Sequence, residues 1–379
     1  MTMRIFAGRI VLKRIAILIF ACVALLFGCG PDDPIRIGFV ASITGRLADT
    51  GISSRDAVQL AVEQCNEQGG IRGIRVKLTI RDDHWNIEAG KNAVRELIEE
   101  GVGAIVGPLT SNIATAVVPY LNESRVIAIG PTVTTTQLAG LDDYFFRVCL
   151  TVREYAYQSA RYQLRSGNMK NIAVAYDGSH QAFCEDWLEN FKKTFVPGGG
   201  KILRLVEFKS NTVPFFSKVA GRLLKTDADG ILIIANPMDS ALLCQQIRKS
   251  NPSIKITLSN WAASPRFIEM GGRAVEGVTV SSAVLSKSPG KPFQTFQKIY
   301  FERFQREPDY TAILSYDATR IILTALKNRN RGQSLKEALL SIKEFHGLKG
   351  KIQLDSNGDV MSSNALIWIV RNRKFVGAE

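Results

Sequence analysis

The sequence has 379 residues, 46% of them hydrophobic, with 48 Lys and Arg against 35 Asp and Glu and a formal net charge of +13. This length predicts about two domains, each large enough to bury a core. The basic side chains are spread along the chain and do not interleave with aromatic residues, which argues against nucleic-acid binding, so the positive charge is interpreted as a solvated surface.

The N-terminal segment has the pattern of an export signal. Basic residues between Arg4 and Arg14 precede an uncharged apolar run from Ile15 to Phe27, which is too short to span a bilayer comfortably and is typical of a signal-peptide core. The sequence Leu26-Phe27-Gly28-Cys29 resembles the bacterial lipobox, so we expect residues 1–28 to be removed and Cys29 to carry lipid. The alternative is an uncleaved membrane anchor. Both interpretations place the bulk of the chain outside the cytoplasm, in the periplasm or on the outer face of the cytoplasmic membrane.

The chain beyond the signal alternates strands and helices. A helix is expected to begin with a capping box at Ser53–Asp56 and to end at Gly69-Gly70. Further helical periodicity covers residues 87–99 and 112–121. The expected strands cover residues 35–40, 75–80, 102–106 and 125–129. This βαβαβαβ order implies a parallel sheet with helices on both faces.

The same alternation restarts after Val152 and predicts a second α/β half. The expected strands there cover residues 171–176, 201–208, 230–235, 255–258 and 277–281. Residues 292–345 are expected to be mostly helical, and residues 351–354 and 365–370 to form a terminal hairpin around Asn357-Gly358. Because no low-complexity linker separates the halves, we expect several short crossings between them.

Four cysteines lie beyond the signal: Cys65, Cys149, Cys184 and Cys244. They stand singly, without a Cys-x-x-Cys pair or a Cys/His cluster, so no metal site is expected. Most of them are interpreted as small buried hydrophobic side chains. An oxidising compartment would permit a disulfide, but the sequence does not assign a pairing.

Enzyme motifs are absent from the sequence. His84, His180 and His346 are the only histidines and offer few general bases, and there is neither a Gly-x-Ser-x-Gly elbow nor a phosphate-binding loop. No catalytic residue and no cofactor is therefore predicted. An exported enzyme on a similar fold is the weaker alternative.

Five motifs occur in a characteristic order along the chain. They are Ile35–Val40 with Thr44-Gly45, Asn66–Gly73, Arg81–Asp83, Val106–Ser111 and Tyr316-Asp317-Ala318. The ordered set resembles the leucine/isoleucine/valine-binding family over essentially the whole mature chain. The resemblance implies the type I periplasmic binding protein fold, an α/β fold of two Rossmann-like lobes with parallel sheets, joined by three crossovers. It implies that lobe 1 covers residues 30–150 and 284–349, and lobe 2 residues 151–283 and 350–379.

Two strand-to-helix turns in the first half are suited to binding an anion. The first delivers Ser111 to a helix N-terminus, where free backbone amides and the helix dipole favour a carboxylate. The second contains Thr132 and Thr134. In such sheets ligands bind beyond the carboxyl ends of the strands, so the two turns could grip one carboxylate, although each hydroxyl could instead only cap its own helix. The resemblance implies that these three residues hold the carboxylate and amino group of an amino acid.

The resemblance also implies further ligand contacts in both lobes. They fall on Thr50 in lobe 1 and on Gln181, Asn236 and Trp261 in lobe 2. Relatives usually pair the ligand ammonium with an acidic residue, and none of these four is acidic. Asp177, Glu185 or Asp239 could supply the charge, and the sequence does not choose among them. Trp261 could cover the ligand or face a cation, or it could be an ordinary tryptophan of the lobe.

The expected function is that of an extracytoplasmic, lipid-anchored solute-binding receptor of an ABC importer. The protein is expected to be a monomer that binds a small molecule, an amino acid of the branched-chain type, between its lobes, closes by a hinge and meets a membrane permease. The alternative is a ligand-binding sensor, or a binding protein for amides, urea or aromatic acids with the same fold.

Overall fold

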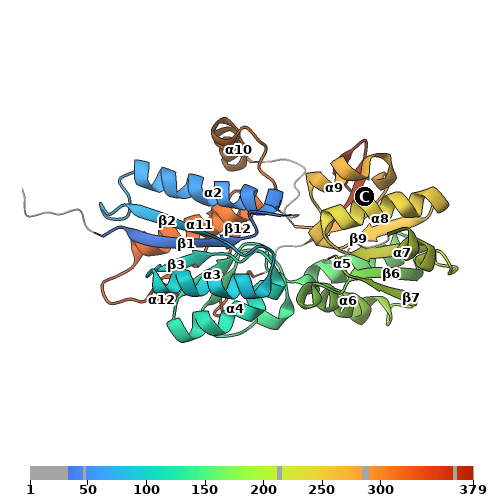
Figure 1. The fold of residues 1–379 in the computed structure, drawn as a ribbon, viewed down its shortest axis with the longest axis horizontal. Coiled ribbons are helices and arrows are strands. Elements are labelled where there is room, and N and C mark those ends of the chain that lie inside the picture. Colours follow the sequence, from blue (N-terminus) through green and yellow to red (C-terminus); the bar gives the residue numbers. More distant parts are fainter. Residues whose placement is uncertain (1–32, 46–47, 211–215, 284–289, 362–364, 379) are drawn as a thin grey trace, which may run out of the picture.

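The computed structural model describes residues 33–45, 48–210, 216–283, 290–361 and 365–378. The predicted signal peptide and the lipidation site Cys29 lie outside the described residues. Figure 1 shows two α/β halves arranged along the longest axis, each built on its own sheet. We call the half with the five-stranded sheet lobe 1 and the half with the seven-stranded sheet lobe 2.

Lobe 1 is built on a parallel sheet of order β2-β1-β3-β4-β5. Its strands are β1 (Ile35–Ala41), β2 (Val76–Asp82), β3 (Ala104–Val106), β4 (Ile127–Gly130) and β5 (Phe145–Arg147). The helices that follow the first strands are α2 (Ala48–Glu67), α3 (Ile87–Glu99) and α4 (Ser111–Ser124). The predicted parallel sheet is confirmed. The short strand β5 was not predicted, because three residues carry no readable periodicity.

The start of α2 differs from the prediction. The helix begins at Ala48, so the expected capping box at Ser53–Asp56 is wrong. Ser53 Oγ instead lies 2.9 Å from Asp309 Oδ1, and Ser54 Oγ lies 2.5 Å from Ser315 Oγ. These polar residues are buried because they bind a helix more than 250 positions later, which local pattern cannot reveal.

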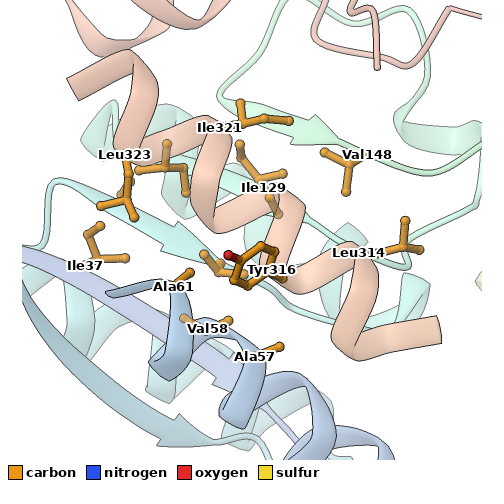
Figure 2. Close-up of a cluster of buried hydrophobic side chains, with 14 of the residues drawn as sticks. Ile37, Ala57, Val58, Ala61, Ile129, Val148, Leu314, Tyr316, Ile321 and Leu323 are labelled. Carbon is orange, nitrogen blue, oxygen red and sulfur yellow. The ribbon is translucent and has the colours of Figure 1, made fainter. Parts of the chain in front are cut away.

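Three helices late in the chain return to lobe 1. They are α10 (Lys291–Phe304), α11 (Tyr310–Asn328) and α12 (Leu335–Leu340), which confirms the expected helical block. Figure 2 shows Ala57, Val58 and Ala61 of α2 turned toward Tyr316 of α11. The core of lobe 1 therefore combines two separate chain segments.

Lobe 2 is built on a sheet of order β14-β13-β10-β9-β8-β6-β7. Its parallel strands are β6 (Asn171–Asp177), β7 (Lys201–Phe208), β8 (Gly230–Ile234), β9 (Lys255–Leu258) and β10 (Thr279–Ser282). Its helices are α5 (Val152–Arg165), α6 (Gln181–Phe195), α7 (Phe216–Leu223), α8 (Pro237–Ser250) and α9 (Pro265–Gly271). Alternate residues of β6 and β8 belong to two separate hydrophobic clusters, so helices cover both faces of the sheet.

The expected terminal hairpin is wrong in its pairing. Strand β12 (Gly350–Ile352) pairs with β11 (Phe345–Gly347), and β13 (Leu366–Arg371) pairs with β10 and with β14 (Lys374–Gly377). The turn at Asn357-Gly358 does form, closed by a single bridge between Leu354 and Val360. Strand β13 instead extends the sheet of lobe 2, a tertiary pairing that the local alternation does not specify.

The chain passes between the two lobes three times. The crossings join β5 to α5, β10 to α10, and β12 to β13. The prediction of several short crossings is thus confirmed.

The four cysteines of the described residues are all free thiols. Cys149, Cys184 and Cys244 are buried, and burial raises the pKa of the Cys149 and Cys244 thiols to about 12. These three are small hydrophobic core residues, as expected.

Asp317 of α11 gives the fold a pH-dependent contact. Its Oδ1 and Oδ2 lie 3.1 and 3.0 Å from the backbone nitrogen of Leu348, and burial raises its pKa to about 7 against the lowering effect of that amide and of Arg320. The folded protein therefore holds this proton up to about pH 7, whereas the unfolded chain releases it near pH 4.

The free energy of unfolding should consequently fall as the pH rises from about 4 to about 7, by an amount on the order of 4 kcal/mol. Asp317→Asn keeps an acceptor for the Leu348 amide and should remove this slope. Urea unfolding at several pH values measures it, with exposed Asp227→Asn as the control. A slope that survives in Asp317→Asn would assign the pH dependence to another group.

Candidate ligand-binding cavity

A cavity lies between the lobes, at the carboxyl ends of strands from both sheets. Its walls follow β3 and β4 in lobe 1 and β6, β9 and β10 in lobe 2. Its volume, measured as the space that the centre of a water molecule can occupy, is about 60 Å³. A single water needs about 10–15 Å³ on the same measure, so the cavity is several times larger. This space suits a small solute.

Two hydroxyl groups at the lobe 1 side of the cavity have no hydrogen-bond partner in the part of the chain that the structure describes. Thr110 precedes α4 without capping it, and its Oγ1 is buried without a hydrogen bond. Thr134 follows β4, is only 4% exposed, and its Oγ1 is likewise buried and unpaired. Leaving such a group unpaired costs about 1–3 kcal/mol. Both hydroxyls are therefore available to a ligand. The N-cap residue of α4 is Thr110, and its side chain makes no capping hydrogen bond, so capping does not account for this hydroxyl.

Ser111 is the first residue of α4 and lines the same wall, beside these hydroxyls. Thr132 also lines the cavity, and its Oγ1 donates to the carbonyl oxygen of Leu109 at 2.6 Å. This bond ties the turn after β4 to the turn after β3. The structure thus brings the predicted residues Ser111, Thr132 and Thr134 together, at the positive end of a helix dipole.

The opposite side of the cavity is aromatic. His180 stacks on Trp85 with ring centroids 4.5 Å apart, and the Trp261 ring meets His180 and Phe183 edge-on, at 5.2 Å from each. We call Trp85, His180, Phe183 and Trp261 the aromatic cluster. Trp85 belongs to lobe 1 and the other three to lobe 2, so the cluster bridges the lobes. The predicted residue Trp261 lines the cavity together with His180 and Phe183.

The environment of His180 favours its neutral form. Burial lowers the pKa of its imidazole, and the carboxylate of Asp177, 3.8 Å from Nε2, opposes this only in part. Asp177 Oδ1 accepts the backbone amides of Ser179 and Ser210 and so orders the turn that carries the histidine. Neither residue brings a positive charge to the cavity.

The other three predicted contact residues do not line the cavity. Thr50 lies in α2, where its carbonyl oxygen accepts the hydroxyl of Thr311 at 3.1 Å. Gln181 is exposed at the first turn of α6. Asn236 is fully buried and caps α8, with Oδ1 2.9 Å from the backbone nitrogen of Asp239. Only Ser111, Thr132, Thr134 and Trp261 of the predicted set are brought together.

Several cavity residues were not predicted. They are Thr110, Asn112, Cys149, Tyr155, Asn260 and Tyr310. Asn260 carried the clearest signal, because it follows β9 directly and neighbours Trp261. Its Oδ1 accepts the indole N–H of Trp187 at 3.1 Å. Tyr155 lies in the first turn of α5 and Tyr310 is the first residue of α11, and only the tertiary fold places both here.

No acidic side chain lines the cavity among the described residues. The internal segments 46–47, 211–215, 284–289 and 362–364, which are not described, contain no Asp or Glu in their sequence. Of the three acids considered from the sequence, Asp177 and Asp239 are buried in hydrogen bonds within lobe 2 and Glu185 is exposed. Among the described residues, no carboxylate therefore lines the cavity where it could meet an ammonium group.

Metal-binding clusters and membrane-spanning helices are both absent from the described part of the chain. It contains no cluster of three or more His, Cys, Asp or Glu side chains placed to hold a metal ion. None of its helices combines the length and apolar character needed to cross a membrane.

Two lobes with a cavity at the carboxyl ends of their strands define a type I solute-binding protein, a class of binding proteins and not of enzymes. The family described as periplasmic binding protein matches residues 34–374. The chain belongs to this family, and membership implies an extracytoplasmic location.

Individual relatives agree with this assignment. The Leu/Ile/Val-binding protein BraC3 of Rhizobium johnstonii is 25% identical over 91% of this chain and 94% of its own length. The substrate-binding protein LivJ of Streptococcus pneumoniae, solved with isoleucine, has a TM-score of 0.81 at 22% identity, covering 92% of this chain and 99% of that one. A solute-binding protein of R. palustris, solved with benzoate, has a TM-score of 0.81 at 16% identity, covering 91% and 95%. At these identities the two structures show the fold alone.

Proposed function

We propose that this protein is the solute-binding receptor of an ABC importer and binds a small carboxylate in the cavity between its lobes. The observation that carries the proposal is the pair of buried, unpaired hydroxyls of Thr110 and Thr134 beside the N-terminus of α4. Hydroxyl and amide donors at a helix N-terminus are complementary to a carboxylate.

The two lobes have the extents that the family resemblance implies. Lobe 1 comprises residues 30–150 and 284–349, and lobe 2 comprises residues 151–283 and 350–379, except that β12 pairs with β11 and so belongs to lobe 1. The two lobes close on the solute by a hinge. The receptor works as a monomer anchored by lipid at Cys29 and delivers its solute to a membrane permease.

Two classes of carboxylate are candidates. The names of the relatives favour a branched-chain amino acid. The cavity itself favours an acid without an ammonium group, because a buried ammonium without a negative partner costs several kcal/mol. The aromatic cluster adds a wall suited to a planar or apolar body. We therefore place an aromatic or apolar monocarboxylate first and a branched-chain amino acid second.

A thermal-shift screen of the purified protein distinguishes the two classes. Benzoate or a hydroxylated benzoate should raise the melting temperature, since a ligand at a hundredfold excess over its Kd adds about 2.7 kcal/mol to stability. Leucine, isoleucine and valine should shift it less. Benzamide, which has the same ring without the negative charge, serves as the control and should have no effect. Stabilisation by the three amino acids and not by the benzoates would reverse the order of the candidates.

A further inference from the structure

The turn that follows β4 already binds a carboxylate, and that carboxylate comes from the other lobe. Asp186 of α6 accepts the hydroxyl of Thr135 at 2.9 Å, the backbone N–H of Thr136 at 2.6 Å and the hydroxyl of Thr136 at 2.7 Å. Asn190, one turn further along α6, donates to Asp186 Oδ1 at 2.7 Å. Three of the four donors thus belong to lobe 1.

The same turn is held from its other side by Arg147 of lobe 1 and by the first crossing. Arg147 is fully buried, and its Nη1 donates to the carbonyl oxygens of Thr135 at 2.8 Å and Val133 at 3.3 Å. The backbone N–H of Val152, at the first crossing, donates to the carbonyl oxygen of Thr134 at 2.6 Å. The backbone on both sides of Thr134 is thus held, while the Thr134 hydroxyl itself remains unpaired at the cavity.

Asp186 accepts three hydrogen bonds from the described part of lobe 1. Its bonds are short and charge-assisted, a kind about twice as strong as neutral hydrogen bonds. Asn112 makes weaker contacts, with the carbonyl oxygen of Ser179 at 3.3 Å and the backbone N–H of Ala182 at 3.1 Å. Arg266 lies 3.7 Å from Asp49 with both side chains exposed, which contributes little.

We propose that Asp186 is a positioning residue that couples the approach of the lobes to the geometry of the ligand-binding turn. When the lobes meet, its carboxylate orders Thr135 and Thr136 and thereby fixes Thr134 between them. When they separate, the carboxylate loses three donors and the turn loses its support from lobe 2. The link to ligand affinity rests on the proposed function, whereas the link between the lobes does not.

The first test uses the protein without ligand. Asp186→Asn should enlarge the radius of gyration measured by small-angle scattering and speed hydrogen exchange in the peptide that contains Thr136. Glu185→Gln removes the same charge from an exposed neighbouring position on α6 and should leave both unchanged. Thr136→Val, which alters the contact from lobe 1, should reproduce the effect. Scattering and exchange equal to wild type in Asp186→Asn and Thr136→Val would overturn the proposal.

The second test adds the probe, benzoate or leucine, that stabilises the wild-type protein. Asp186→Asn should weaken its binding about tenfold or more in calorimetry, and Glu185→Gln should bind like wild type. Affinity unchanged in Asp186→Asn, despite a larger radius of gyration, would overturn the coupling to the site. If neither probe binds the wild type, the proposed ligand class fails, while the scattering and exchange results still decide the role of Asp186.

Discussion

Replacing Ser111 and Thr134 together by alanine is expected to lower the affinity for the solute by at least about 100-fold while the protein remains folded. Each hydroxyl would donate to a carboxylate, and a hydrogen bond to a charged group contributes about 1.5–3 kcal/mol. Two such bonds therefore account for roughly two orders of magnitude or more in Kd. Isothermal titration calorimetry with the stabilising carboxylate measures the loss.

The stability of the same double variant separates a ligand-binding role from a structural one. Because the Thr134 hydroxyl is buried without a partner, its removal should leave the free energy of unfolding unchanged or raise it by about 1 kcal/mol. Binding and stability would then change in opposite directions, as expected for a site that is costly to maintain. Thr115→Ala is the control, since that hydroxyl donates to the carbonyl oxygen of Asn112 on the same helix. Unchanged affinity in the double variant would remove the carboxylate site from these turns.

The sequence was most informative where a residue's environment is set by its immediate neighbours. Helix α3 and strands β7 and β9 have the predicted bounds, because local apolar patterning marks all three and glycines flank α3 and β7. The same local pattern placed three residues at the cavity: Ser111, Thr132 and Thr134. Each lies in or at the end of the turn after a buried parallel strand, and the carboxyl ends of such strands meet at one edge of the sheet.

The sequence was least informative where a distant segment supplies the partner. Ser53 and Ser54 were read as a helix start, but they bind α11 inside the core of lobe 1. Asn236 has the strand-to-helix position of a ligand contact and serves as a helix cap, a distinction that depends on where the cavity lies. Asp186 stands within a helix without any motif, and only the fold brings it to Thr136.

Replacing Arg147 by methionine is expected to destabilise the protein by about 3–5 kcal/mol, the usual cost of breaking a buried ion pair from one side. Arg147 Nε lies 2.5 Å from Asp359 Oδ1, with the arginine side chain fully buried and that of Asp359 14% exposed. Its loss leaves this carboxylate and the carbonyl oxygens of Val133 and Thr135 with fewer donors. Urea unfolding measures the change, and Arg204→Met on the exposed edge strand β7 should stay within about 0.5 kcal/mol of wild type.

The double variant Arg147→Met/Asp359→Leu tests which of these contacts matters. If the unpaired carboxylate causes most of the loss, removing both charges should recover much of the stability, as buried ion pairs replaced by apolar residues often do. Ligand affinity should not recover with it, because the carbonyl oxygens beside Thr134 would still lack the guanidinium that holds them. A double variant as unstable as Arg147→Met would instead assign the stabilisation to the carbonyl contacts. Recovery of stability and affinity together would show that the turn keeps its shape without Arg147, and that Asp186 and the first crossing are enough to hold it.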